Sequence, residues 1–135
     1  MTDVVPEFLD RVRAICMALP EAYEEPAWIG VRWRIRKRTF AHVVTVDDDS
    51  TSVFKEAFAL EGEATAVTFR VLGDELLALR EHGHPFYYAG WGRDVMGMHL
   101  DDSTDWDELG ELLTDSYCVL APKKLVVRAR WGWAD

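Results

Sequence analysis

Five cationic side chains fall within seven consecutive residues, and we call them the basic cluster: Arg32, Arg34, Arg36, Lys37 and Arg38. Guanidinium groups donate hydrogen bonds in a planar fork that matches phosphate oxygens, and lysine adds a compact positive charge. The whole chain of 135 residues carries a net charge of −9 at pH 7, so this cluster is a local exception. Because local field decides what a surface attracts at a Debye length of about 8–10 Å, the cluster predicts phosphate contact, with DNA as the candidate partner.

A second basic pair, Lys123 and Lys124, follows a predicted helix end and is a candidate second patch. Cations at that place also complement the dipole of the preceding helix, which is the alternative interpretation. The basic cluster likewise has a second interpretation, a solvated sheet face whose arginines pair with the acidic residues 47–49. Since an acidic protein of this kind is not a generic nucleic-acid binder, any DNA binding is expected to be weak and salt-sensitive.

A competing site is predicted in the glycine-rich aromatic segment HPFYYAGWGRD at residues 84–94. Aromatic walls with a single charged group are the usual composition of a ligand pocket. The candidate pocket residues, which would serve a small molecule or a protein partner, are Trp33, Tyr87, Tyr88, Trp91 and Arg93. Packing of these rings in the core and in the loop is the plainer alternative.

Motifs for catalysis and for metal binding are missing from the sequence. There is no GxSxG, no phosphate-cradling glycine loop and no metal-ligand spacing among the four histidines. The segment DDSTDWDE at residues 101–108 begins like a calcium loop, but Trp106 and Leu112 occupy the positions that need Gly and Glu. We therefore expect a binding protein without enzyme activity, cofactor or metal.

Hydrophobic periodicity places these residues on a short series of elements. Helices are expected at residues 5–19, 74–82, 105–120 and 123–130, and strands at residues 28–36, 39–46, 65–71 and 95–100. The first strand should turn Val31, Trp33 and Ile35 to the core and Arg32, Arg34 and Arg36 to the other face, with a tight turn at residues 37–38. The last long helix is expected to be capped by Thr104, and Gly97 predicts a bulge or a close approach.

Residues 20–26 read as an acidic loop, and residues 53–60 as a short helix or a strand. The order of elements predicts a single α+β domain over residues 1–135, with a four-stranded antiparallel sheet and helices packed on one face. No apolar run approaches about 18 residues, and the first ten residues lack a signal-peptide pattern. We therefore expect a cytoplasmic protein without membrane contact.

Four segments in order give the chain a recognisable relationship: ALPEAYEEPAW, RTFAHV, HPFYYAGWGRDVMGMHLDD and DWDELGELLTDSYCVLAPKKL. Together they resemble the MmcQ/YjbR family over roughly residues 11–128. The resemblance implies a frataxin-like α+β fold, also described as a double-wing DNA-binding motif, and it implies no particular reaction. The acidic segment 47–63 beside the basic cluster is a departure that bears on the DNA interpretation, because it could cover the arginines.

Overall fold

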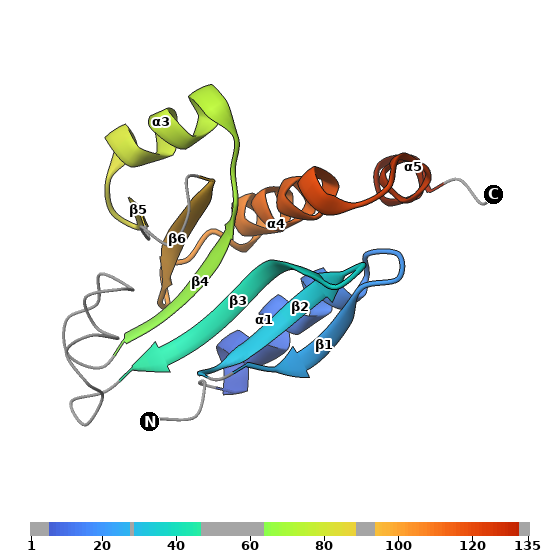
Figure 1. Ribbon diagram of the computed structural model, residues 1–135. Helices are drawn as coiled ribbons and strands as arrows, with labels where there is room; N and C mark the ends of the chain where they lie inside the picture. The colour runs from blue at the N-terminus through green and yellow to red at the C-terminus, as the bar shows by residue number, and fades with distance from the viewer. Residues whose placement is uncertain (1–5, 28, 47–63, 89–93, 133–135) are drawn as a thin grey trace.

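The computed structural model describes residues 6–27, 29–46, 64–88 and 94–132, and these form an α+β fold (Figure 1). The elements, in chain order, are α1 (Pro6–Met17), β1 (Tyr23–Pro26), β2 (Val31–Ile35), β3 (Arg38–Val46), β4 (Ala64–Arg70), α3 (Gly73–His82), β5 (Phe86–Tyr88), β6 (Val95–Leu100), α4 (Trp106–Leu120) and α5 (Lys123–Trp131). The strands form one sheet in the order β1-β2-β3-β4-β6-β5, and every neighbouring pair is antiparallel.

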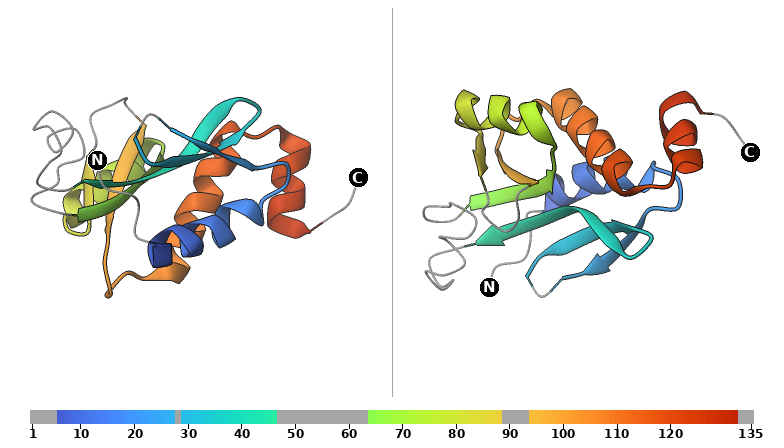
Figure 2. Two further views of the ribbon diagram at one scale, coloured as in Figure 1. Left: turned by 90° about the horizontal axis from the view of Figure 1, so that it is seen from below. Right: turned by 45° about the horizontal axis from the view of Figure 1, so that its top comes forward.

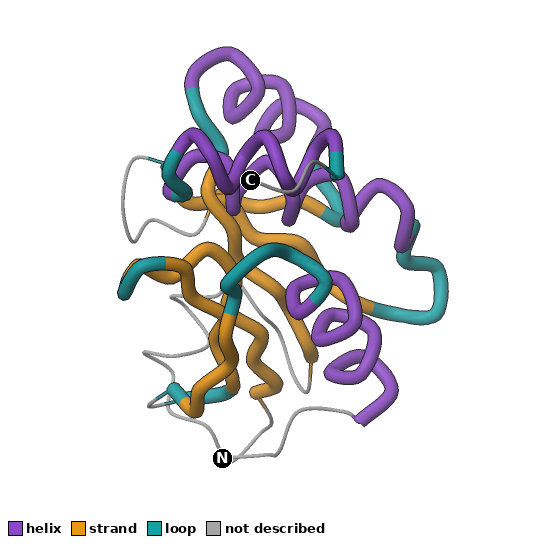
Figure 3. The backbone as a smooth tube through the Cα atoms, turned by 90° about the vertical axis from the view of Figure 1, so that its right-hand side faces the viewer, coloured by secondary structure: helices purple, strands orange, loops and turns teal. Residues whose placement is uncertain are grey.

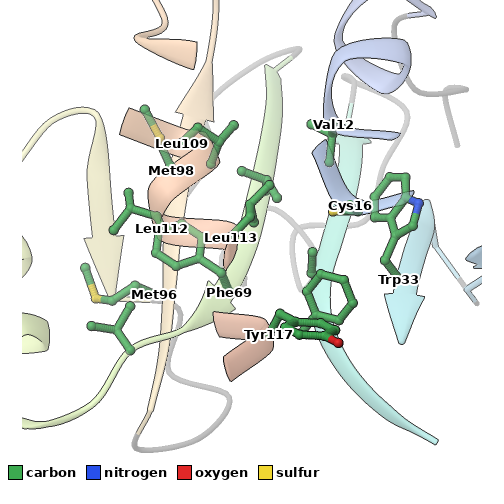
Figure 4. Close-up of a cluster of buried hydrophobic side chains, with 14 of the residues drawn as sticks. Val12, Cys16, Trp33, Phe69, Met96, Met98, Leu109, Leu112, Leu113 and Tyr117 are labelled. Atoms are coloured by element: carbon green, nitrogen blue, oxygen red, sulfur yellow. The ribbon is translucent and has the colours of Figure 1, made fainter. Parts of the chain in front are cut away.

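The helices cover one face of this sheet, as the α+β prediction required (Figures 2 and 3). Helices α1 and α4 lie directly on the strands, α3 lies over β5, and α5 packs against the end of α4. The main core between these layers takes side chains from all four helices, among them Val12, Leu76, Leu109 and Leu125. Trp33 and Ile35 are fully buried there, as predicted, and Figure 4 shows Trp33 near Cys16 of α1.

Two strands were missed, so the expectation of four strands is wrong and the sheet has six. The acidic segment at residues 20–26 contains β1, an edge strand that pairs with β2, and the aromatic segment contains the three-residue β5. Both are too short for periodicity to detect, and glutamate is a poor strand former. Cross-strand pairing of Glu25 with Arg32 compensates for that preference in β1.

The turn between β2 and β3 lies one residue earlier than predicted. Arg36 and Lys37 form it with φ angles of 51° and 66°, while Ile35 pairs with Arg38. Two successive left-handed residues are the geometry of a type I′ turn, which matches the twist of the flanking strands. Arg36 is therefore a turn residue and does not share the strand face of Arg32 and Arg34, which is a correction.

Two local predictions about α4 and β6 have different outcomes. Thr104 is not the cap of α4: Asp105 is, and its Oδ1 accepts a hydrogen bond from the Glu108 amide at 3.0 Å. Thr104 Oγ1 instead accepts from the Asp101 amide, in the turn that precedes the helix. The close approach at Gly97 is confirmed, since a Cβ there would lie 2.2 Å from Cζ of Tyr87. The prediction for residues 53–60 lies outside the described residues.

Candidate functional site

The arginines of β2 are held by a glutamate of the neighbouring strand. Glu25 of β1 faces Arg32 across the ladder, and its Oε1 accepts hydrogen bonds from both Arg32 and Arg34, the latter at 3.0 Å. Partial burial acts to raise the pKa of Glu25, but the hydrogen bonds from Arg34 and Arg32 outweigh it, so the pKa is lowered. Glu25 is therefore an acidic partner of both arginines. The predicted pairing with residues 47–49 falls outside the described part of the chain.

The turn residues are more accessible than the strand residues. Arg36 lies 3.2 Å from Glu21, and both side chains are about half exposed. Lys37 and Arg38 are exposed and form no ion pair with any residue that the structure describes. Arg34 also donates a hydrogen bond to the carbonyl of Lys37, which stabilises the turn. Within the basic cluster, Lys37 and Arg38 are thus the cations without an acidic partner among the described residues, and Arg36 has an exposed partner in Glu21.

Lys123 and Lys124 are exposed in the first turn of α5. The dipole of α5 disfavours cations at that end, although the C-terminus of α4 lies just before them. Helix α5 and the β2–β3 turn lie at the same end of the molecule (Figures 1 and 2). The structure therefore brings both predicted basic groups to one end.

The buried Tyr117 of α4 contacts the loop between α1 and β1. Its hydroxyl donates to the carbonyl of Pro20 at 2.7 Å, and burial raises its pKa to about 12. Glu21, which follows Pro20 in the chain, lies 3.2 Å from Arg36, so this loop also contacts the β2–β3 turn. We call the exposed and half-exposed cations gathered here the basic end: Arg36, Lys37, Arg38, Lys123, Lys124 and Arg128.

The predicted aromatic residues are not brought together. Trp33 is fully buried in the core, and its Nε1–H donates to Glu24 at 3.1 Å. Tyr87 lies on the opposite face of the sheet, with Ile29 and Val44, and three strands separate β2 from β5. Tyr88 returns to the helix face, where the Arg80 guanidinium lies 4.4 Å from its ring centroid.

Trp91 and Arg93 of the aromatic segment lie outside the described residues, so the predicted pocket is not seen as a unit.

Within the described ranges, no group of three His, Cys, Asp or Glu residues is placed to hold a metal ion. The rings of His84 and His99 are stacked, with 5.8 Å between their centroids. Among the helices in the same ranges, none combines the length and the apolar character needed to cross a bilayer.

Sequence reasoning missed Glu21 and Glu25, which decide how much of the basic cluster is free. The available signal was the segment PEAYEEP, whose acidic residues precede the arginine strand by about the length of a hairpin. Because that segment was predicted to be a loop, no cross-strand partner for the arginines was expected from it. A cross-strand search for opposite charges between residues 20–26 and 31–36 would have suggested the pairing.

Comparison with known proteins identifies the family. A crystal structure of a protein from Pseudomonas syringae, a Northeast Structural Genomics Consortium target, matches 84% of this chain and 95% of its own with a TM-score of 0.61. At 14% identity this likeness concerns the fold alone. None of the curated proteins matches the chain. The YjbR family model matches residues 17–119, which is most of the chain and includes β2 and all but the last residue of α4. The chain therefore belongs to the YjbR family.

Proposed function

We propose that this protein is a non-catalytic binding protein that contacts DNA phosphates through its basic end. The observation that supports the proposal best is the conformation of the β2–β3 turn. Arg36 and Lys37 occupy two left-handed positions, where Asn and Gly are the favoured residues. A left-handed conformation costs a residue with a Cβ about 1–2 kcal/mol. Two cations kept at such positions indicate a function for their charge, since strained backbone concentrates at functional sites.

The arginine face of β2 plays a smaller part in this proposal than the sequence predicted. Arg32 and Arg34 share one carboxylate and have side chains that are 37% and 22% exposed. Their guanidinium groups are already engaged, so a phosphate would have to displace Glu25. Among the described residues, Lys37, Arg38 and the two lysines of the first turn of α5 have no such competitor, whereas Arg36 has an exposed one in Glu21. Contact is therefore expected at the end of the hairpin and not along its face.

The expected binding is weak and independent of DNA sequence. Lysine and arginine contacts to phosphate release condensed counterions, so affinity falls as salt rises. Four to six such contacts correspond to a slope of log K against log salt of about −4 to −5. Raising salt fourfold, from about 50 to about 200 mM, should then weaken binding by about a hundredfold or more.

The test is fluorescence anisotropy of a labelled duplex of about 20 base pairs, titrated with the full chain at both salt concentrations. Lys37→Ala with Arg38→Ala should weaken binding at least tenfold and make the salt slope shallower by about 2. Glu25→Gln should strengthen binding, because it releases Arg32 and Arg34. Arg80→Ala on α3, away from the basic end, is the matched control and should change little. Absence of binding at about 50 mM salt overturns the proposal.

A further inference from the structure

A separate feature lies on the helix side of the molecule. Helices α1, α4 and α5 border an open groove with a volume of about 860 Å³. Ile15, Gly110 and Ala129 lie along it together with the indole rings of Trp106 and Trp131. Trp131 is 66% exposed, an unusual state for the largest apolar side chain. Because the family match spans residues 17–119, Ile15 and all of α5 lie outside it, so the groove is built partly from segments beyond the matched range.

Gly110 is placed in the interior of α4 without a packing reason. A Cβ added there would meet no atom of another element within 4 Å. Glycine at an interior helix position costs about 1 kcal/mol relative to alanine. The open space beside it is the groove itself. The fold therefore gains nothing from this glycine, whereas a partner that approaches α4 closely would.

The charge of the groove is mainly negative. Asp107 and Glu111 stand one helical turn apart on α4 and form no ion pair with any described residue. Asp115 is paired with Arg130 at 2.7 Å, so these two charges cancel. The Arg11 guanidinium lies over the Trp106 ring, 5.0 Å from its centroid, at the α1 side. Like charges at i and i+4 destabilise a helix slightly, which a bound cation would relieve.

We propose that this groove binds a cationic amphipathic segment of a partner protein. An apolar side chain of the partner would lie on Gly110 between the two indole rings, and a lysine or arginine beside it would pair with Asp107 and Glu111. Binding of an amphipathic helix in a groove uses this combination of anchors and flanking charge. Exposed tryptophan faces also attract cations. DNA is disfavoured here, because its phosphates carry the same sign as the unpaired carboxylates.

The probe is a fluorescein-labelled peptide of about 14 residues made of lysine and leucine in helical amphipathic order, with a glutamate–leucine peptide as its counterpart. Both are titrated into the ¹⁵N-labelled full chain. The lysine peptide should shift the amides of residues 107–115 and 129–131 and the indole resonance of Trp131. Shifts that are absent, or scattered over the whole surface, or equal for the glutamate peptide would overturn the proposal.

Three variants sharpen the test. Asp107→Asn with Glu111→Gln should weaken binding of the lysine peptide at least tenfold. Glu75→Gln with Glu81→Gln on α3 removes the same charge elsewhere and should leave that binding unchanged. Gly110→Ala should raise the melting temperature and weaken the peptide at the same time, because the added methyl group stabilises the helix and occupies the groove. A Gly110→Ala chain that is more stable and binds equally well contradicts the proposal.

Discussion

Glu24 and Glu25 are neighbours in the chain and serve opposite faces of the sheet. Successive side chains of a strand alternate, so Glu24 faces α1 while Glu25 faces the arginines of β2. Glu24 accepts hydrogen bonds from Arg13 Nε at 2.7 Å, from Arg13 Nη2 at 3.1 Å and from the indole of Trp33. One carboxylate therefore joins the edge strand, the first helix and the largest core side chain.

This network predicts the effect of Glu24→Ala at the residue scale. Trp33 is fully buried, so loss of its acceptor leaves an indole N–H without a hydrogen bond. Together with the lost charged hydrogen bonds to Arg13, the change should lower the free energy of unfolding by about 2 kcal/mol. Urea denaturation followed by tryptophan fluorescence measures it. Asp10→Asn, which removes only an exposed i,i+3 partner of Arg13, is the control and should stay within about 0.5 kcal/mol.

In the β2–β3 turn, the two cationic residues should lower the stability of the chain while they support DNA binding. Arg36→Asn with Lys37→Gly supplies the residues that a type I′ turn prefers, so it should raise the free energy of unfolding by about 1–2 kcal/mol while DNA binding falls. Arg36→Gln with Lys37→Gln removes the same charges and keeps the strain, so it should weaken DNA binding with little gain in stability. An Asn-Gly chain that is no more stable than the parent would refute the explanation of the turn.

The β5–β6 pair offers a second test at this scale. Tyr87 pairs with Gly97 across the ladder, and its ring centroid lies 4.7 Å from that of His99. Gly97→Ala should destabilise the chain by about 1–3 kcal/mol, because the new methyl group overlaps the tyrosine ring. In a Tyr87→Ala background the same change should cost almost nothing, and a double-mutant cycle measures this coupling. Additive effects of the two changes would show that the ring does not limit residue 97.

The longer helices and strands were predictable from the sequence, and the two shortest strands were not. All four helices in the described ranges and strands β2, β3, β4 and β6 were predicted, because their apolar residues recur over five or more positions. Strands β1 and β5 have four and three residues, too few for a period to appear. The two basic groups were found from composition alone. Their acidic partners were not found, since Glu25 meets Arg32 and Arg34 only when β1 pairs with β2 in the sheet.

Helix α5 connects the two proposed surfaces of the molecule. Its first residues, Lys123 and Lys124, belong to the basic end, and its last, Trp131, borders the acidic groove. This separation of charge makes the proposed phosphate contact compatible with a net charge of −9. The two surfaces have opposite sign, so DNA and a cationic peptide would occupy different sites. They adjoin at the last turn of α5, where Arg128 of the basic end precedes the groove residue Ala129.

The dependence of stability on pH should reflect titratable groups on the strands of the sheet. Burial lowers the pKa of His42, which contacts the carbonyl of Ile29, and also that of His99. The unfolded chain therefore binds more protons than the folded one below about pH 6.5, so stability falls as pH decreases there. The hydrogen bond from Arg13 lowers the pKa of Glu24, and its contribution is lost as pH falls below about 4.3.

We therefore predict two successive losses of unfolding free energy on acidification from pH 7.5. Urea denaturation at pH 7.5, 6, 5 and 4 would show the first loss below about pH 6.5 and the second below about pH 4.3. His42→Gln keeps a donor near Ile29 without the titration, so it should reduce the first step to the contribution of His99 and leave the second. Glu24→Gln should reduce the second step, to which Glu25 still contributes, and leave the first unchanged. A stability that stays constant between pH 7.5 and pH 5 would contradict the assignment of the histidines, because no other described group with a lowered pKa titrates in that window.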